Sequence, residues 1–173
     1  MRRIFIITVL VALTLINVGI YAQADKNMTY SKYIAACLYS FSRYVNWPAD
    51  KKSGDFVITV VGNKDVYNDL QQMIVGKMVG DQHIVVKYSR IASELNNNSQ
   101  MIFLSENQSS GVQKLEANGT LVVSEQEGTV QKGASVDFVN VDDVVKFEIS
   151  KTNMTRQGLQ INSFLEKLSY RVI

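Results

Sequence analysis

The sequence has one cysteine, one histidine and one proline among 173 residues. A lone cysteine cannot form an intramolecular disulfide, so the stability of the chain must come from its core. A lone histidine argues against a metal site built from several histidines, and His83 has no nucleophile motif near it that would indicate a catalytic triad. One proline and 10 glycines argue against a long linker or a low-complexity segment.

The chain also has no excess of positive or negative charge once its first 24 residues are excluded. Arg2 and Arg3 precede an apolar run over 4–20, and Ala22-Gln23-Ala24 supplies the small-x-small pattern of a cleavage site. We therefore expect residues 1–24 to be a signal peptide, with an uncleaved membrane anchor as the alternative. Removing both arginines from the 18 basic residues leaves 16, equal to the 16 acidic ones. A neutral chain gives no electrostatic reason to expect nucleic-acid binding.

Residues that could carry chemistry are few and scattered. Gly62 follows an apolar run but is not part of a phosphate-binding glycine motif. Asp142 and Asp143 are adjacent acids of the kind found in turns, and Cys37 falls on the apolar face of a predicted helix, where a buried, inert thiol is expected. We therefore expect no catalytic residue, no metal site and no cofactor.

Hydrophobic spacing predicts the fold. Apolar residues recur every three or four positions from Tyr30 to Val45, which is typical of a helix, and Pro48 stops that pattern after Trp47. Short β-branched runs predict strands that alternate with helices, and the last helix is interrupted at Gly158. The predicted class is α/β: one domain over 25–173, a three-layer sandwich with a mixed, mainly parallel sheet and a C-terminal hairpin plus helix. Predicted strands cover 56–61, 83–88, 101–104, 120–124, 135–140 and 144–150, and predicted helices cover 65–74, 91–95, 109–117 and 151–168.

The order of several local strings resembles the YfiR family of bacterial periplasmic proteins. The resemblance covers about residues 30–170, and the ordered set of strings is more specific than any one of them. An apolar helix running into Trp-Pro opens the set, and a Gly-Leu-containing segment closes it. The matching strings lie at 33–41, 44–48, 56–62, 101–105, 120–125, 133–138, 145–149 and 154–168.

This resemblance implies a non-enzymatic periplasmic regulator. Its partner would be an inner-membrane diguanylate cyclase, whose periplasmic sensor region it would bind so as to restrain cyclic di-GMP synthesis and biofilm formation. A homodimer is the family expectation. A small-ligand-binding module in the periplasm, or an accessory protein of a sensor histidine kinase, are the alternatives. The paired cysteines of the best-known branch are absent here, so redox control is not expected.

A binding site for a partner or small molecule is predicted where the Trp-Pro turn meets the last motif. Some family members carry arginine or histidine there, whereas this chain has amides, which removes charge-assisted bonds to an anionic nucleotide. A partly exposed tryptophan beside amides would suit a contact surface. The alternative is that the tryptophan fills the core and the glycine permits close helix packing. The residues placed in this site are Asn46, Trp47, Gly158, Gln160 and Asn162.

Overall fold

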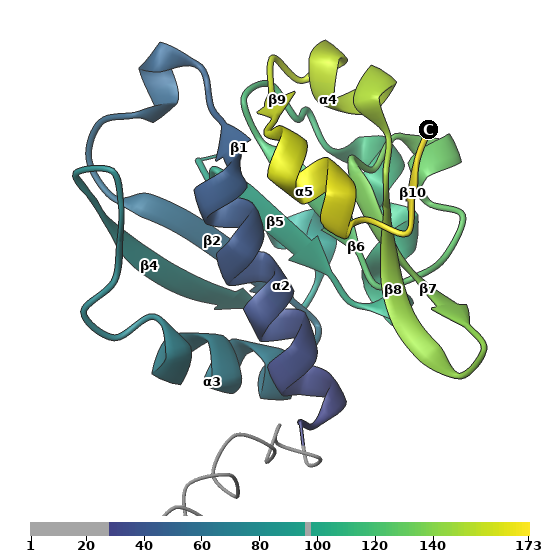
Figure 1. The fold of residues 1–173 in the computed structure, drawn as a ribbon. Coiled ribbons are helices and arrows are strands. Elements are labelled where there is room, and N and C mark those ends of the chain that lie inside the picture. Colours follow the sequence, from purple (N-terminus) through teal and green to yellow (C-terminus); the bar gives the residue numbers. More distant parts are fainter. Residues whose placement is uncertain (1–27, 96–97) are drawn as a thin grey trace, which may run out of the picture.

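The computed structural model describes residues 28–95 and 98–173. The predicted signal peptide over 1–24 lies outside the described residues. Within these described ranges, no helix combines the length and the apolar character needed to cross a membrane. The strands and helices alternate along the chain, as the sequence predicts (Figure 1).

The first helix, α2 (Tyr30–Tyr44), begins at Thr29, whose hydroxyl accepts the backbone N–H of Lys32. Its apolar face is buried, and the ring of Phe41 meets that of Phe147 edge-on at 5.0 Å between centroids. The helix ends at Tyr44, earlier than the apolar pattern predicts, because the next two residues form strand β1 (Val45–Asn46). Figure 1 shows α2 crossing the face of the sheet.

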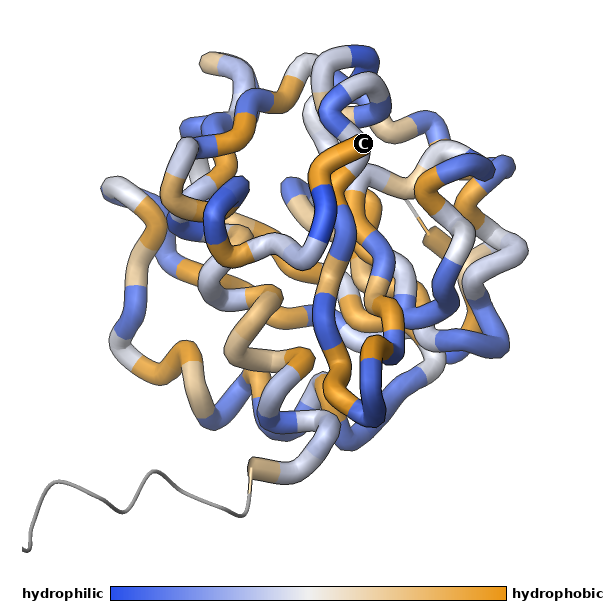
Figure 2. Tube along the Cα trace, turned by 45° about the vertical axis from the view of Figure 1, so that its right-hand side comes forward, coloured by the Kyte–Doolittle hydropathy of each residue, from blue (hydrophilic) through white to orange (hydrophobic). Residues whose placement is uncertain are grey.

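In the part of the chain that the structure describes, the main sheet has eight strands in the order β10-β8-β7-β6-β5-β2-β4-β3. All neighbouring pairs are parallel except β7–β8 and β3–β4, which confirms the mixed, mainly parallel sheet. Hydrophobic residues concentrate in the central strands (Figure 2). The strands are β2 (Phe56–Val61), β3 (Met78–Val79), β4 (Gln82–Ser89), β5 (Met101–Leu104), β6 (Leu121–Ser124), β7 (Val136–Val141), β8 (Val144–Ile149) and β10 (Arg171–Val172).

Layers on both faces of the sheet complete a three-layer sandwich. One layer contains α2 and α3 (Lys64–Met73), which pack over the larger core. The opposite layer consists of 3₁₀ turns, chiefly η4 (Glu106–Lys114), over a smaller core. The α-helix predicted over 109–117 is therefore wrong in type and starting point. Ser109, Ser110 and Gly111 are weak helix formers, and a Cβ on Gly111 would lie 2.6 Å from Ala92. The remaining short turns are η2 (Ala49–Lys51), η3 (Ala92–Glu94) and η5 (Val130–Lys132).

The hairpin of β7 and β8 closes through Asp142 and Asp143, with φ values of 52° and 60°. Positive φ at both central residues matches the right-handed twist of the two strands, and aspartate tolerates it better than most residues. These two acids thus serve the turn, as their sequence pattern indicates.

The C-terminal helix predicted over 151–168 is in fact two short helices. α4 (Lys151–Arg156) ends before Gly158, whose φ of 75° lies in the left-handed region. Strand β9 (Gln160–Ile161) follows, and α5 (Ser163–Leu168) then begins at Asn162, whose side chain accepts the N–H of Phe164 at 2.7 Å. α5 lies beside α2 (Figure 1).

Candidate functional site

Strands β1 and β9 form a separate two-stranded antiparallel sheet. Asn46 lies opposite Gln160 in this sheet, and the backbone N–H of Asn162 donates to the carbonyl of Tyr44 at 3.0 Å. The structure therefore brings the Trp-Pro turn and the last motif together, although more than 100 residues separate them in the sequence. The side chains of Asn46, Gln160 and Asn162 are exposed, and Gly158 is exposed beside them.

Trp47 does not belong to this exposed group. Its side chain is only 6% exposed, its ring meets that of Phe56 edge-on at 4.8 Å, and its indole N–H donates to the carbonyl of Gln100 at 3.0 Å. The expectation of a partly exposed tryptophan is wrong, because a buried carbonyl satisfies the indole and lets the ring enter the core.

Gln100 is a residue that the sequence analysis missed. Its side-chain amide donates to the carbonyls of Lys51 and Asp55, and its side-chain oxygen accepts the N–H of Val57 at 2.9 Å. A buried glutamine thus fixes the loop that follows Trp47. Its only sequence signal was a polar residue directly before a strand, which does not distinguish it from its neighbours.

Gly158 is not required for close packing of helices, which was the alternative role predicted for it. Apart from its neighbours in the sequence, none of the described residues has an atom within 4 Å of the position that its Cβ would occupy. The left-handed backbone is what requires glycine, because it ends α4 and lets the N–H of Leu159 donate to the carbonyl of Met154 at 2.9 Å. Leu159 is buried, and Gln160 then enters β9.

An aromatic pair adjoins the exposed amides. The rings of Tyr44 and Phe164 lie 4.8 Å apart, and Phe164 is 47% exposed. Sequence reasoning missed Phe164, because a single long helix does not show which of its faces stays open. We call the surface formed by Tyr44, Asn46, Gln160, Asn162 and Phe164 the β1–β9 surface.

A cavity of about 340 Å³ opens next to this surface. Its walls are apolar at Val45 and Trp47, and Arg43 with Asp81 supplies charges of both signs. A volume in this range fits a small molecule. The remaining lining residues are Ser42, Asn46, Lys52, Phe56, Val79, Gly80 and Gln82.

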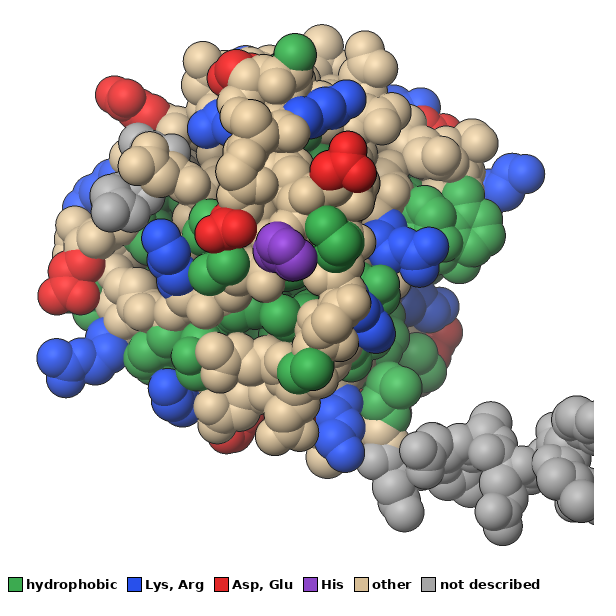
Figure 3. Space-filling view, turned by 90° about the vertical axis from the view of Figure 1, so that its left-hand side faces the viewer, with side chains coloured by type: hydrophobic (Ala, Val, Ile, Leu, Met, Phe, Trp, Pro, Cys, Tyr) green, Lys and Arg blue, Asp and Glu red, His purple; other side chains and the backbone are tan. Residues whose placement is uncertain are grey.

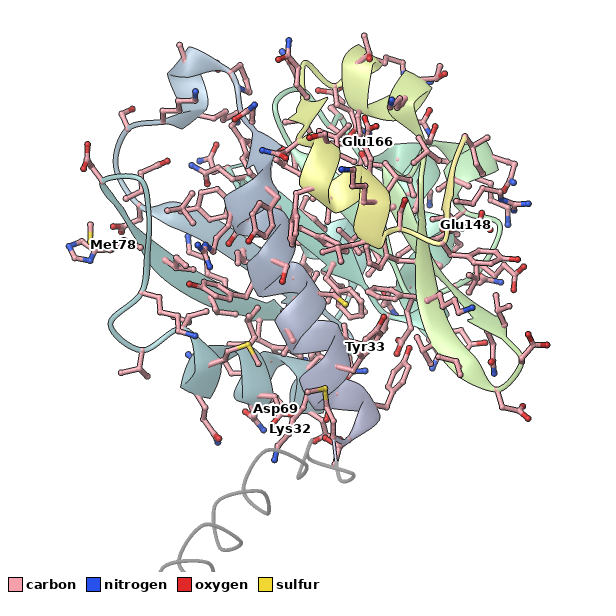
Figure 4. All side chains as sticks on the ribbon, viewed as in Figure 1. Lys32, Tyr33, Asp69, Met78, Glu148 and Glu166 are labelled. Carbon is pink, nitrogen blue, oxygen red and sulfur yellow. The ribbon has the colours of Figure 1, made fainter. Side chains whose placement is uncertain are left out.

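Groups with catalytic potential lie away from the β1–β9 surface. Cys37 is buried on α2, and burial raises the pKa of its thiol to about 11, while a hydrogen bond with Tyr33 lowers it in part. Tyr33 lies toward the N-terminal end of α2 (Figure 4). His83 is exposed on β4, on a face where acidic and basic side chains are interspersed (Figure 3). Across the described ranges, no three His, Cys, Asp or Glu residues gather as metal ligands.

A crystal structure of a conserved domain protein from Vibrio cholerae has a similar fold, with a TM-score of 0.56 and 10% sequence identity. The match covers 85% of this chain and 61% of that one, so the chain spans about three fifths of the Vibrio protein's length. No curated protein matches the sequence.

The family comparison covers most of the chain. The model that describes YfiR/HmsC-like proteins matches residues 31–169, which contain the whole main sheet except β10 and all of the β1–β9 surface. Proteins of this family are periplasmic in general. The chain therefore belongs to the YfiR/HmsC-like family, whose general role is regulation of diguanylate cyclase signalling rather than catalysis.

Proposed function

We propose that this protein is a non-enzymatic periplasmic repressor that binds the sensor region of an inner-membrane diguanylate cyclase through its β1–β9 surface. Binding would restrain cyclic di-GMP synthesis and thereby biofilm formation. The mechanism is a population shift, in which the cyclase binds one state of the repressor better than another. The observation that carries this proposal is the family match over residues 31–169.

The composition of the β1–β9 surface supports its choice as the contact. Tyr44 and Phe164 supply aromatic area, and Asn46, Gln160 and Asn162 surround it with amides. Aromatic anchors within a polar rim are typical of protein interfaces. Because backbone bonds fix both strands, the surface is preorganised and loses little conformational entropy on binding.

The proposal includes the processing and assembly of the chain. Residues 1–24 are removed as a signal peptide, and 25–173 act as one YfiR-like domain that forms a homodimer. Sedimentation of the purified mature protein tests the dimer, and mass spectrometry of the periplasmic protein tests the cleavage after Ala24. Neither measurement depends on identifying the cyclase.

The test is recovery of partners from solubilised inner membranes with the tagged protein as bait. Asn46→Arg and Gln160→Arg place charge on the β1–β9 surface without touching the core. Asn68→Arg and Gln72→Arg make the same changes at exposed positions of α3 and serve as matched controls. We expect the wild type and both controls to recover a cyclase, and both surface variants to lose it.

Other results would change the conclusion in defined ways. If both surface variants recover the cyclase as well as the wild type does, the repressor function still holds, but the contact surface is not the β1–β9 surface. Recovery of a sensor histidine kinase instead would make the protein a kinase accessory. If no membrane protein is enriched, the repressor proposal fails.

The second candidate is a small-ligand-binding module, which the cavity of about 340 Å³ favours. Its ligand would contact Trp47 and Arg43, both of which line that cavity. Native mass spectrometry of protein taken directly from the periplasm would detect such a ligand by its added mass. This candidate takes the leading place if a small molecule co-purifies while no membrane partner does.

A further inference from the structure

A second cavity, of about 540 Å³, is lined by the end of η4 and the loop after it, by β6, by the turn before β7 and by the end of α4. It has no lining residue in common with the cavity beside Trp47. Its apolar wall comes from Val112, Leu115 and Val122, and its charged rim contains Lys132, Arg156 and Glu116. Two cations against one carboxylate give the rim a net positive charge.

A buried amide holds Arg156 in place at this rim. Nη2 of Arg156 donates to Oδ1 of Asn153 at 3.0 Å. The side-chain amide of Asn153 in turn donates to the backbone carbonyls of Val130 and Ala134, at 2.7 and 2.6 Å. Asn153 is 7% exposed, so α4 and the loop before β7 together fix the guanidinium.

Gly133 makes room for the same guanidinium. A Cβ at Gly133 would lie 3.3 Å from Nη2 of Arg156, and its φ of 116° already disfavours other residues. The glycine thus allows the arginine to lie close over the backbone at the cavity mouth. Gln157, also buried, closes this side by donating to the carbonyl of Gly133 at 3.2 Å.

The guanidinium has no carboxylate partner within the described part of the chain. The two ion pairs there join Lys151 to Glu166 and Arg171 to Glu148, and neither involves Arg156 or Lys132. Glu116 lines the cavity but forms no ion pair with either cation. An arginine fixed by a buried amide, with N–H groups left unpaired beside an apolar wall, is suited to bind an oxyanion.

We infer that this cavity binds a small organic anion, whose carboxylate or phosphate pairs with Arg156 and Lys132 while its apolar body covers Val112, Leu115 and Val122. The volume is in the range of small-molecule sites. Glu116 restricts the ligand to one anionic group near the two cations, because a second one would meet like charge. This inference does not rest on the proposed function.

The test is calorimetric titration of the purified protein with benzoate and with phenyl phosphate, and benzamide as the neutral control of similar shape. We expect at least one anion to bind and benzamide not to bind. Arg156→Gln and Lys132→Gln should each weaken the binding about tenfold or more, because each removes a charge-assisted hydrogen bond. Lys167→Gln makes the same charge change at an exposed position outside the cavity and should leave the affinity unchanged.

Comparing the two anions identifies the preferred anionic group of the ligand. Tighter binding of benzoate indicates a carboxylate, and tighter binding of phenyl phosphate indicates a phosphate. Lys132 is exposed, so its variant remains informative even if Arg156→Gln does not fold. The inference is overturned if neither anion binds at about 10 mM, a concentration that detects even millimolar affinity. It is also overturned if Lys132→Gln binds both anions as tightly as the wild type and the control Lys167→Gln do.

Discussion

Asp137 and Glu148 lie directly opposite each other in the β7–β8 pair, and both carboxylates are buried. Glu148 pairs with Nη2 of Arg171 at 2.6 Å. Asp137 accepts the N–H of Val130 at 3.2 Å through one oxygen, and its other oxygen has no partner among the residues that the structure describes. Of these two adjacent buried acids, only Glu148 is paired with a guanidinium, which β10 supplies. Figure 4 labels Glu148 on β8, next to β10.

Asp137→Asn should become increasingly favourable relative to the wild type as the pH rises. Burial raises the pKa of Asp137, and repulsion by Glu148 adds to the effect, although the N–H of Val130 opposes it. The unfolded carboxyl therefore ionises first, and the wild type loses stability from about pH 4 upward until the folded carboxyl ionises too. Asparagine keeps an acceptor for the N–H of Val130 without the charge, so the variant should be more stable than the wild type at neutral pH.

Urea unfolding of both proteins at pH 4 and pH 7 measures this difference, and comparing the two proteins cancels the contribution of carboxyls that do not interact with Asp137. A constant loss of stability for Asp137→Asn at both pH values would contradict the prediction. It would mean that folding does not raise the pKa of Asp137, because a raised pKa makes the stability difference depend on pH.

Arg171→Gln should lower the melting temperature more than Lys151→Gln does. The first change leaves the buried carboxylate of Glu148 without a counter-charge, next to Asp137, and that is costly. The second breaks a pair with Glu166, in which both side chains are at least partly exposed and which contributes little. Calorimetric melting at neutral pH compares them. Equal melting temperatures would show that water screens Glu148.

The thiol of Cys37 should react slowly with a disulfide reagent at about pH 8 in the folded protein, and at once in denaturant. Its pKa of about 11 keeps it protonated, and the reactive species is the thiolate. Burial also blocks access. Absorbance at the wavelength of the released reagent follows the rate, and rapid labelling of the native protein would show that α2 opens readily.

Trp47→Phe and Trp47→Ala should separate packing from hydrogen bonding. Phenylalanine keeps the edge-on contact with Phe56 but loses the bond to Gln100, so unfolding should become easier by about 1 kcal/mol. Alanine leaves a cavity and should cost roughly 3–5 kcal/mol. Denaturant unfolding measures both. Because of this structural role, loss of partner binding in Trp47→Ala would not locate a contact surface.

The elements that could be predicted from the sequence are those whose pattern is local. The continuous β-branched run of Phe56–Val61 identifies β2, because strands buried on both faces show no alternation. Likewise, the spacing of Ile34, Leu38 and Phe41 identifies α2, since its single apolar face packs on one side of the sheet. The paired aspartates at 142 and 143 identify the hairpin turn.

The elements that could not be predicted depend on distant partners. β1, β9 and β10 have two residues each, too few for any periodicity, and each exists only because another segment lies beside it. Gly158 interrupts the helical pattern, but nothing local indicates that Gln160 then pairs with Asn46. In the candidate site, the contact between the Trp-Pro turn and the last motif could be predicted. The burial of Trp47 could not, because it depends on the distant carbonyl of Gln100 that accepts the indole N–H.

The pairing of β1 with β9 affects the order in which parts of the fold can form during synthesis. A polypeptide is synthesised from its N-terminus, so Val45 and Asn46 are made more than 100 residues before their partners Gln160 and Ile161. Contacts between such distant segments also slow folding. The end of α2 therefore acquires its native surroundings only after Ile161 has been made, and a chain truncated before residue 160 cannot form the β1–β9 surface at all.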